Sequence, residues 1–477
     1  MRYEMKKFTE LPIPRWFPYG RSILVVLIIL SAFSLTGAED WPTYMHDNAR
    51  SGVTTESLTP DELDEGWIYV PPAPPQVAWD GGAPWDAYRS NATTTFELTP
   101  QRDFDFVFAV TVIGKLLYFG SSVTDSVHCL DVHTGRQKWF FTTEGPVRYP
   151  PSYYDGKLYF GSDDGYAYCI DASDGSFIWK YSPSEGTRLV GNNGSFISMW
   201  PVRTGMAVLD GKVYFAASLV NWQTSYLCSL DAQTGSDSGS GLYCVSGGVT
   251  PMGAVLASAT RIYLLQGRLH PYAFNRATGA VSGTFGERGQ SGCYALLTSN
   301  SRFVRGHAKV HAEGYELAEH DAEGRDRIAA HPNARHLVVS GTTAYVLTRT
   351  SLLAVSRSNG SVQWSVPCDY PHALIQAGDV LFAGGTNKVA AYSITNGDEI
   401  WNRVVNGRAR ALAAAGGRLF VSTDTGSIHM FGRAHLPADL NKDRVADLLD
   451  LTMSAKNYLG CTNPANVKLH CENLPDP

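Results

Sequence analysis

A short phrase, Leu-Asp-x-x-Thr-Gly with a Trp four residues after the glycine, recurs along this chain and constrains what it can fold into. The first clear copy runs from Leu130 to Gly135 with Trp139, and the next from Ile170 to Gly175 with Trp179, forty residues later. Self-similarity at a period of about forty residues is typical of stacked or radial repeats, not of an ordinary globular domain. We place the glycine of the phrase at seven positions: Gly135, Gly175, Gly235, Gly279, Gly324, Gly360 and Gly397.

Each repeat reads as four short strands. A turn followed by a hydrophobic run precedes most copies of the phrase, as in Asp155-Gly156 before residues 157–161. Asp-Gly supplies the positive φ that a tight hairpin needs, and short β-branched and aromatic runs between Gly, Asp and Asn turns indicate a meander. Amphipathic helical periodicity is nearly absent between residues 100 and 432. A repeated four-stranded antiparallel unit predicts a β-propeller.

The number of repeats predicts the number of blades. Seven complete phrases precede a partial copy at residues 408–432, which has three inner strands but no outer strand with Trp. Residues 66–70, which include Trp67, read as the missing strand. Closing the ring with a strand from the other end of the chain removes an exposed sheet edge. We therefore predict an all-β fold, an eight-bladed β-propeller over residues 39–434 that is closed by an N-terminal strand.

At these residues the chain resembles the pyrroloquinoline-quinone (PQQ)-like propeller repeat family. That family includes the quinoprotein alcohol dehydrogenases and the outer-membrane assembly lipoprotein of the β-barrel insertion machinery. The resemblance covers residues 41–432, and residues 41–52 are similar to the opening segment of secreted bacterial members. It implies that the outer-strand tryptophans dock on the neighbouring blade and pack there: Trp139, Trp179, Trp364 and Trp401. The repeat is specific for the fold and weak for function.

A redox cofactor is implied only for the quinoprotein members of that family. Those enzymes carry two adjacent cysteines against the quinone and hold a Ca²⁺ beside a catalytic Asp. None of the eight cysteines of this chain is adjacent to another, and we place that calcium ligand set on no stretch of it. Because the redox chemistry needs the cofactor, the sequence argues against PQQ and against a dehydrogenase.

Residues 1–38 read as a secretory signal peptide. A basic stretch precedes the apolar run 23–33, which is too short to span a bilayer comfortably, and small residues at 36–38 offer cleavage before Glu39. A retained N-terminal anchor is the alternative. Ala38 stands where a lipoprotein would carry its acylated Cys, so we expect no lipid anchor. The expectation is a secreted, periplasmic or cell-surface monomer whose mature chain has no transmembrane span.

Charge and cysteine content fit an exported protein. Removal of residues 1–38 would leave 34 Lys and Arg against 43 Asp and Glu, and an acidic protein of this kind is a poor nucleic-acid binder. Export permits disulfides. Cys461 with Cys471 could form one bridge and Cys228 with Cys244 another, and we interpret the second pair as flanking the insertion in the longest repeat. Equivalent places in successive repeats suggest that Cys129 and Cys169 are buried strand residues.

The tail, residues 435–477, carries a calcium-loop motif. Oxygen-bearing side chains recur at loop positions 1, 3, 5, 9 and 12, with a backbone carbonyl at position 7: Asp439, Asn441, Asp443, Asp447, Asp450 and the carbonyl of Val445. With the apolar stretch 451–459, this EF-hand-like loop resembles a single dockerin repeat, whereas a full dockerin has two. Arg444 stands where such a loop should have Gly. The alternative is a solvated acidic loop before a C-terminal helix.

Cations begin several of the predicted innermost strands. They are Arg148, Arg203, Arg335, His372 and Arg410. In a propeller these positions lie at the channel mouth, where a partial ring of cations would attract an acidic glycan, a carboxylate or a phosphate. The alternative is that each Arg pairs with a carboxylate of the adjacent blade. A histidine-rich stretch, residues 307–320, is a weaker candidate for a metal site.

Together these features predict a secreted, non-catalytic scaffold. Its channel mouth or rim would hold an unknown protein or an acidic glycan, and a Ca²⁺-stabilised tail would attach it. The sequence has no Gly-x-Ser-x-Gly, phosphate-loop, His-Glu-x-x-His or Cys-x-x-Cys-His motif, so hydrolase, nucleotide and haem functions lack support. Two alternatives stay open: a PQQ-dependent dehydrogenase-like enzyme and a cell-envelope assembly factor.

Overall fold

Short antiparallel strands make up nearly all of the described structure, which is a computed structural model. It describes residues 39–76, 78, 109–184, 186–192, 194–219, 223–237, 242–246, 251, 253–266, 270–286, 294–299, 301–306, 316–433 and 452–453. Residues 1–37 and residues 38–477 are separate units, and the account below concerns the second. The predicted signal peptide lies outside the described residues, and so do all six predicted calcium ligands.

Six sheets of the described ranges have four antiparallel strands each. Three of these are β3 (Val110–Ile113), β4 (Leu116–Ser121), β5 (Ser126–Asp131) and β6 (Gln137–Thr142); β7 (Ser152–Tyr154), β8 (Lys157–Gly161), β9 (Ala167–Asp171) and β10 (Phe177–Tyr181); and β13 (Ala207–Leu209), β14 (Lys212–Ala217), β15 (Thr224–Asp231) and β16 (Leu242–Ser246). The other three are β17 (Leu256–Ala257), β18 (Arg261–Leu264), β19 (Tyr272–Asn275) and β20 (Val281–Thr284); β21 (Tyr294–Leu297), β22 (Arg302–Gly306), β23 (Glu316–Asp321) and β24 (Arg327–Pro332); and β25 (His336–Ser340), β26 (Thr343–Leu347), β27 (Ser351–Ser356) and β28 (Val362–Pro367).

The two ends of the chain share a larger sheet. Its eight strands run in the order β1, β29, β30, β31, β32, β33, β34, β2. They are β1 (Val53–Thr54), β2 (Asp64–Tyr69), β29 (Ala373–Ala377), β30 (Val380–Gly384), β31 (Thr386–Ser393), β32 (Glu399–Ala415), β33 (Arg418–Thr423) and β34 (Ile428–Gly432). The first part of β32 pairs with β31 and its last part with β33, so this one long strand links two four-stranded groups. β2 pairs antiparallel with β34, which places Trp67 opposite Met430.

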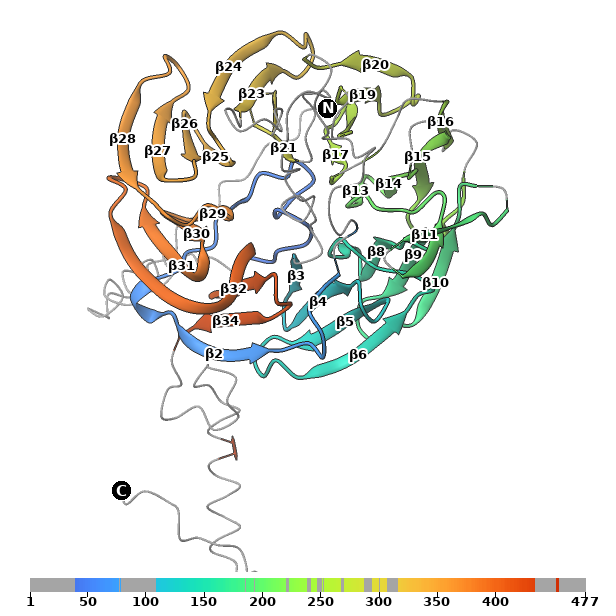
Figure 1. The fold of residues 1–477 in the computed structure, drawn as a ribbon, viewed down its shortest axis with the longest axis horizontal. Coiled ribbons are helices and arrows are strands. Elements are labelled where there is room, and N and C mark those ends of the chain that lie inside the picture. Colours follow the sequence, from blue (N-terminus) through green and yellow to red (C-terminus); the bar gives the residue numbers. More distant parts are fainter. Residues whose placement is uncertain are drawn as a thin grey trace, which may run out of the picture. The chain divides into compact units, whose positions relative to one another are not determined.

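The sheets follow one another around a ring (Figure 1). Each innermost strand contacts that of the next sheet, in the order β3, β7, β13, β17 and β21, and again from β25 through β29 and β32 back to β3. Tyr294 of β21 links to β25, because its hydroxyl donates to the carbonyl of Leu337 at 2.6 Å. The hydrophobic core lies between the faces of neighbouring sheets; one cluster joins Tyr159 of β8 to Phe215 of β14. This arrangement is a β-propeller, as the repeats predict.

Helix contributes almost nothing to the described residues. They contain the 3₁₀ turn η1 (Pro60–Glu62) and two further helical residues at 452–453. The hairpin turns explain the strand-rich fold: Asp155 and Gly156 both have positive φ, +48° and +76°, between β7 and β8. Within the same residues, no helix is long and apolar enough to cross a membrane.

The tryptophans of the outer strands join neighbouring sheets. Trp179 of β10 donates its indole N–H to the carbonyl of Ala232, 3.1 Å away in a turn of the next sheet. A Cβ on Gly235 of that turn, whose φ is +68°, would lie 2.6 Å from the indole Cδ2. Glycine is therefore required there both by the backbone and by the ring that rests on it. Equivalent contacts are Trp67 with Val132 and Gly135, Trp139 with Ser173 and Gly175, and Trp364 with Ile394 and Gly397, while Trp401 donates to Leu63.

In one pair of sheets the contact is reversed: the outer strand supplies the glycine and the turn of the next sheet supplies the large side chain. The residue four after Gly279, where other repeats have Trp, is Gly283 of β20. In the next sheet the turn position belongs to Arg325, which has a φ of +71° and donates its N–H to the carbonyl of Asp321 as the phrase glycines do. The guanidinium of Arg325 lies over Gly283. The phrase position predicted at Gly324 is therefore wrong by one residue.

The insertion in the longest repeat also differs from the prediction. The connection between β10 and β13, residues 182–206, is the long one, and it carries the hairpin of β11 (Leu189–Asn192) and β12 (Ser195–Ser198). Cys228 and Cys244 do not flank it: they lie on the adjacent strands β15 and β16, where the backbone of Cys228 pairs with Leu242 and that of Cys244 with Tyr226.

Two other cysteines lie where the repeats predict them. Cys129 and Cys169 are buried strand residues, as predicted. Burial raises the pKa of each thiol to about 12, so both stay protonated at neutral pH.

Candidate functional site

The two ends of the ring differ because the N-terminal segment occupies one of them. Residues 41–54 lie in the middle of the ring (Figure 1, blue) and bond to the innermost strands of several sheets near the points where those strands finish. The backbone partners are Trp41 with Val112, Pro42 with Tyr153, Asn48 with Ala257, Ala49 with Leu297 and Gly52 with Gln376. The segment therefore satisfies inner-edge groups that would otherwise face the channel. It leaves the opposite end, where the innermost strands start, as the candidate site.

Arg50 fastens this segment from inside. Its side chain is fully buried, and Nη2 donates to the carbonyls of Met206 and Val255 at 2.7 and 2.8 Å. Nη1 donates to the Thr43 hydroxyl at 2.8 Å. Burial lowers the pKa of Arg50 to about 10. A buried cation is tolerated only when its donors are satisfied, and here carbonyl and hydroxyl oxygens of the segment and of two sheets satisfy them.

Two of the predicted channel-mouth cations meet at one carboxylate. Arg148 Nε donates to Asp163 Oδ2 at 2.8 Å, and Arg203 Nε donates to Asp163 Oδ1 at 2.7 Å. Asp163 follows β8, and Arg203 precedes β13, so the pairing crosses from one sheet to the next. The Asp163 side chain has no exposed surface, while those of Arg148 and Arg203 are 5% and 10% exposed. Of the two arginines, Arg203 pairs with a carboxylate of the adjacent sheet, as the alternative has it, whereas Arg148 pairs with one of its own sheet.

The charges at this node are coupled. Burial alone would raise the pKa of Asp163, but the two guanidinium groups outweigh it and hold that pKa below its ordinary value. The neighbouring Asp164 and Asp125 are affected in the opposite direction, because burial raises the pKa of each. Two positive guanidinium groups and one buried carboxylate give the node a net charge of one positive. The nearby acids reduce its attraction for an anionic ligand.

The chain covers part of this node with its own backbone. After β2 it continues as a strap, residues 71–76, towards the strand-start end of the ring. Gln76 accepts a hydrogen bond from Arg148 Nη1 at 2.9 Å, and its N–H donates to Ser122 at 2.8 Å. The carbonyl of Ala78 accepts from Asn192 of β11 at 3.1 Å. Arg148 is thus directed at protein oxygens on two sides.

The other predicted cations lie at three different innermost strands. Arg335 immediately precedes β25, His372 precedes β29, and Arg410 lies within β32. The N–H of Arg335 donates to the carbonyl of Leu347 at 2.7 Å. His372 Nε2 and the Thr386 hydroxyl are 3.0 Å apart. Arg148 and Arg203 share Asp163 as a partner.

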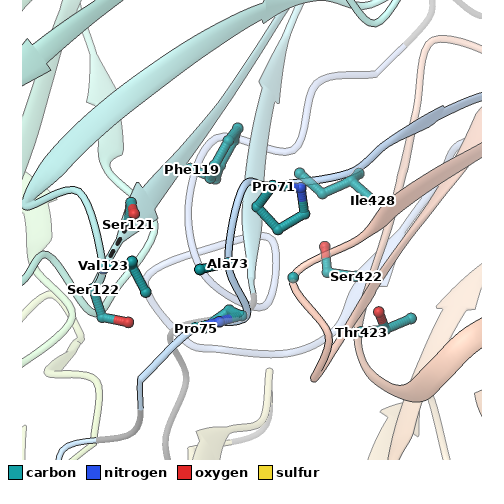
Figure 2. A pocket seen from close by; sticks show the side chains of 12 residues that line it. Pro71, Ala73, Pro75, Phe119, Ser121, Ser122, Val123, Ser422, Thr423 and Ile428 are labelled. Carbon is teal, nitrogen blue, oxygen red and sulfur yellow. Dashed lines mark hydrogen bonds between the residues drawn. The ribbon is translucent and has the colours of Figure 1, made fainter.

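The strap borders a small pocket between the first and last sheets (Figure 2). Its volume is about 40 Å³, which is room for a few water molecules and far below the size of a ligand site. A Cβ on Gly426 would lie 2.6 Å from Cγ of Pro71 and 2.8 Å from Cδ of Pro75, so the strap rests on this glycine. The lining comprises Pro71, Ala73, Pro75, Phe119, Gly120, Ser121, Ser122, Val123, Ser422, Thr423, Gly426 and Ile428.

The hairpin β11–β12 beside the node presents an apolar face. Leu189 pairs with Ser198 and Gly191 with Phe196, so Leu189 and Phe196 lie on the same face of the two-stranded sheet. They are 59% and 73% exposed, while Ile197 on the other face is 1% exposed. Ile197 thus holds the hairpin to the ring, and the opposite face has large apolar side chains in solvent. The sequence analysis missed this feature, although the sixty-residue spacing between Gly175 and Gly235 was its signal.

A second buried ionic node lies elsewhere in the ring. Glu319 of β23 has a side chain that is 1% exposed, and it accepts from Arg302 at 2.9 Å, Arg357 at 3.0 Å and His331 at 2.9 Å. Arg357 comes from the next sheet, so this node also joins two sheets. Burial would raise the pKa of Glu319, but its hydrogen bonds to His331 and the two arginines hold it at about 2. Buried arginines in this protein therefore bind protein carboxylates at two separate places.

Across the described ranges, no three His, Cys, Asp or Glu side chains are grouped closely enough to hold a metal ion. The calcium loop, residues 439–450, and most of the histidine-rich stretch, residues 307–315, lie outside those ranges. His320 is described: its Nε2 accepts from Arg305 at 3.1 Å, and Nδ1 lies 3.1 Å from the carbonyl of Arg325. That histidine is engaged in packing between neighbouring side chains.

Comparison with known proteins agrees with this geometry. A family profile described as outer membrane protein assembly factor BamB matches residues 76–237, 123–366 and 203–435. The solved BamB from Moraxella catarrhalis is 14% identical with a TM-score of 0.51, over 70% of this chain and 96% of that chain. The quinohemoprotein alcohol dehydrogenase from Comamonas testosteroni is 14% identical with a TM-score of 0.59, over 83% of this chain and 81% of that one. A europium-containing methanol dehydrogenase is 12% identical with a TM-score of 0.57, over 82% and 98%. A search of curated proteins gave no match.

These comparisons show a family and a fold. At such low identity, the structural similarity to BamB and to the dehydrogenases shows the fold alone. The three ranges matched by the profile overlap and run from residue 76 to residue 435, well over half of the chain. They span the repeated strands and the turns on which the tryptophans rest. The chain therefore belongs to the PQQ-like propeller-repeat family whose profile is described as outer membrane protein assembly factor BamB.

Proposed function

We propose that the protein is a non-catalytic scaffold of the cell envelope, exported through its N-terminal segment, that binds a partner protein. The observation that carries this proposal is the outward face of the hairpin β11–β12, where Leu189 and Phe196 are 59% and 73% exposed. Exposed apolar side chains grouped on a projecting element are typical of protein interaction sites, and large aromatic residues contribute most to such contacts. The hairpin is also a sheet of two strands. The N–H of Ser198 in β12 donates to the carbonyl of Asp163 at 2.8 Å, so β11 is the strand whose outer edge would pair with an incoming strand.

An eight-bladed ring is part of the proposal. The chain of contacts among β3, β7, β13, β17, β21, β25, β29 and β32 supports this count. The long strand β32 supports it as well, because it serves as the outer strand of one group and the innermost strand of the next. Each interface between blades would then have the same construction. A rigid ring of this kind holds its surface hairpin in a fixed orientation.

A protein partner is favoured over an acidic glycan at the strand-start end. Arg148 and Arg203 already bind Asp163 at 2.8 and 2.7 Å, so an anionic glycan would have to compete with a buried carboxylate. The family description favours a more specific version, an envelope assembly factor, in which the partner belongs to the outer-membrane assembly machinery. Both versions use the hairpin as the contact surface.

The experiment is site-specific photocrosslinking in a bacterial envelope, with the crosslinker at Leu189 or Phe196. We expect one dominant crosslinked protein, and Phe196→Ser should weaken binding of that purified protein by at least about tenfold, as loss of an aromatic anchor does. Val404→Ser is the matched control, because Val404 is 74% exposed on the outer strand β32. Equal loss in both variants, or no crosslinked partner, would contradict the proposal.

Catalysis and calcium binding are tested separately. Turnover of an alcohol in a dye-linked assay, by protein incubated with PQQ and Ca²⁺, would overturn the non-catalytic proposal in favour of a dehydrogenase-like enzyme. For the tail, we propose that the loop from Asp439 to Asp450 binds Ca²⁺ through alternate oxygen ligands. Asp443→Ala with Asp450→Ala should abolish Ca²⁺ binding measured by calorimetry, and retained binding would rule out this loop.

A further inference from the structure

Glu39, the residue that follows the predicted cleavage point, is held tightly against the propeller. Its backbone N–H donates to Glu56 Oε2 at 2.6 Å, and its carbonyl accepts from the N–H of Gly416 at 3.2 Å. Its carboxylate accepts from the N–H of Thr55 at 2.6 Å and from the hydroxyl of Thr54. The chain therefore has a fixed path from this residue onward, and the nitrogen of Glu39 is aimed at a carboxylate.

Glu56 is a buried carboxylate without a cation. The residue is 8% exposed, and its other oxygen, Oε1, accepts from the N–H of Gly417 at 2.5 Å. Within the described ranges, no Lys, Arg or His side chain lies within salt-bridge distance of Glu56; His46 instead lies 3.3 Å from Glu39. Burying a charge is costly unless an opposite charge accompanies it. The nitrogen of Glu39, 2.6 Å from Oε2, is placed to supply one.

We propose that export cleaves the chain before Glu39 and that the new α-ammonium group of Glu39 forms a buried ion pair with Glu56. This inference depends on the export that is part of the proposed function. An endoprotease of the export pathway would add water across the peptide bond, with the hydroxyl going to the carbonyl carbon of Ala38 and a proton to the nitrogen of Glu39. The free amine then takes a second proton from solvent, which supplies the positive charge beside Glu56.

The pair would fix both ends of the propeller in one place. Glu56 also accepts from the turn between β32 and β33, where Gly416 and Gly417 lie. Those two strands belong to the sheet that β2 completes. Cleavage would therefore strengthen the closure of the ring at the moment the leader is removed, and the uncut chain would retain only the neutral N–H contact.

The pH dependence has a definite sign. An α-amino group titrates at about 8 in an unfolded chain, and a carboxylate partner raises that pKa in the folded state. The stabilisation is therefore fully present below about pH 8 and is lost as the pH rises through the raised value. The charged groups near the site are the side chain of Glu39, His46 beside it and Asp47, which lies 4.0 Å from His46. On the other side is Arg418, whose Nη1 donates to the carbonyl of Gly416 at 2.6 Å. Asp40 is engaged separately by the N–H of Gly114 at 2.7 Å.

The test uses the full chain, exported from a bacterial host. Intact mass should give Glu39 as the first residue. In a variant with Gly-Ser inserted after Ala38, cleavage would place the ammonium group two residues before Glu39 and so remove it from Glu56. We expect the half-point of α-amine labelling by an acylating reagent to lie about one pH unit higher in the native protein than in this variant. The native protein should also melt about 1–2 °C higher at pH 7, and the gap should close by about pH 10.

Glu56→Gln and Asp40→Asn form a matched pair of variants. Glu56→Gln should lower the labelling half-point to that of the Gly-Ser variant. Asp40→Asn keeps the α-amine of Glu39, Glu56 and an oxygen acceptor for the N–H of Gly114, so it should leave the half-point high. Equal half-points in the native and Glu56→Gln proteins would overturn the ion pair. Export with cleavage at another bond would overturn the inference alone, because partner binding through Phe196 would still be measurable. A chain that remains uncut in the cytosol would instead contradict the proposed function.

Discussion

The contact between Trp179 and Gly235 can be tested by adding one methyl group. In Gly235→Ala the backbone stays at a φ of +68°, which costs a residue with a Cβ about 1–2 kcal/mol. The new Cβ would also lie 2.6 Å from the indole Cδ2, well inside the ~3.5–4.0 Å of an ordinary carbon contact. Displacing a buried ring adds about 1–3 kcal/mol. The expected loss in the free energy of unfolding is therefore about 2–5 kcal/mol.

Gly360 provides the matched control for this substitution. It has the same turn position in another repeat and a φ of +73°, but no atom lies within 4 Å of a Cβ built on it. Gly360→Ala should therefore cost only the backbone term, about 1–2 kcal/mol. Urea unfolding, followed by circular dichroism under identical conditions, measures both variants. Equal destabilisation would refute the reasoning, since the two sites differ in the tryptophan alone.

Three other experiments test the buried contacts of the sheets. Glu319→Gln should lower the free energy of unfolding by about 3–5 kcal/mol at pH 7. The pKa of Glu319 is held at about 2, so the difference in melting temperature between the variant and the native protein should shrink as the pH falls from about 4 to 2. Asp163→Asn leaves two buried guanidinium groups without their carboxylate and should be destabilised to a similar extent in urea titrations, with the gap narrowing below about pH 4. Gly283→Trp alone should lower the melting temperature, and Arg325→Gly combined with it should restore much of the loss, a coupling that a double-mutant cycle measures.

The repeating phrase contains most of the information about the fold. Its turn glycines, the hydrophobic runs and the closing strand around Trp67 are local signals, and the structure has four-stranded antiparallel sheets where they predict them. The phrase also identifies Trp179 and Trp364, whose indole groups bond to the next sheet at 3.1 and 3.0 Å. These features are predictable because each repeat has the same local geometry as its neighbours.

The contacts at the candidate site could not be predicted in this way. Asp163 meets Arg203 forty residues further along the chain, and no spacing in the sequence marks that pair. The segment around Arg50 bonds to strands of several sheets and has no periodic pattern of its own. Its partners are mainly backbone carbonyls, which every residue has, so the sequence contains no sign of them. Contacts of this kind depend on how the sheets are arranged in the folded ring, so only the structure identifies them.

The exchange between Gly283 and Arg325 shows why a repeat can lose its phrase and still keep its place in the ring. At this interface one large side chain again contacts a residue without a Cβ, but the sheet that supplies each of them is reversed. Arg325 adopts a φ of +71°, which is strained for a residue with a Cβ, and its guanidinium covers the glycine that replaces the tryptophan. When each repeat is compared separately with the phrase, both residues count as mismatches. A comparison of the two positions across neighbouring repeats identifies them as a compensated pair, because the packing requirement belongs to the interface and not to either sheet.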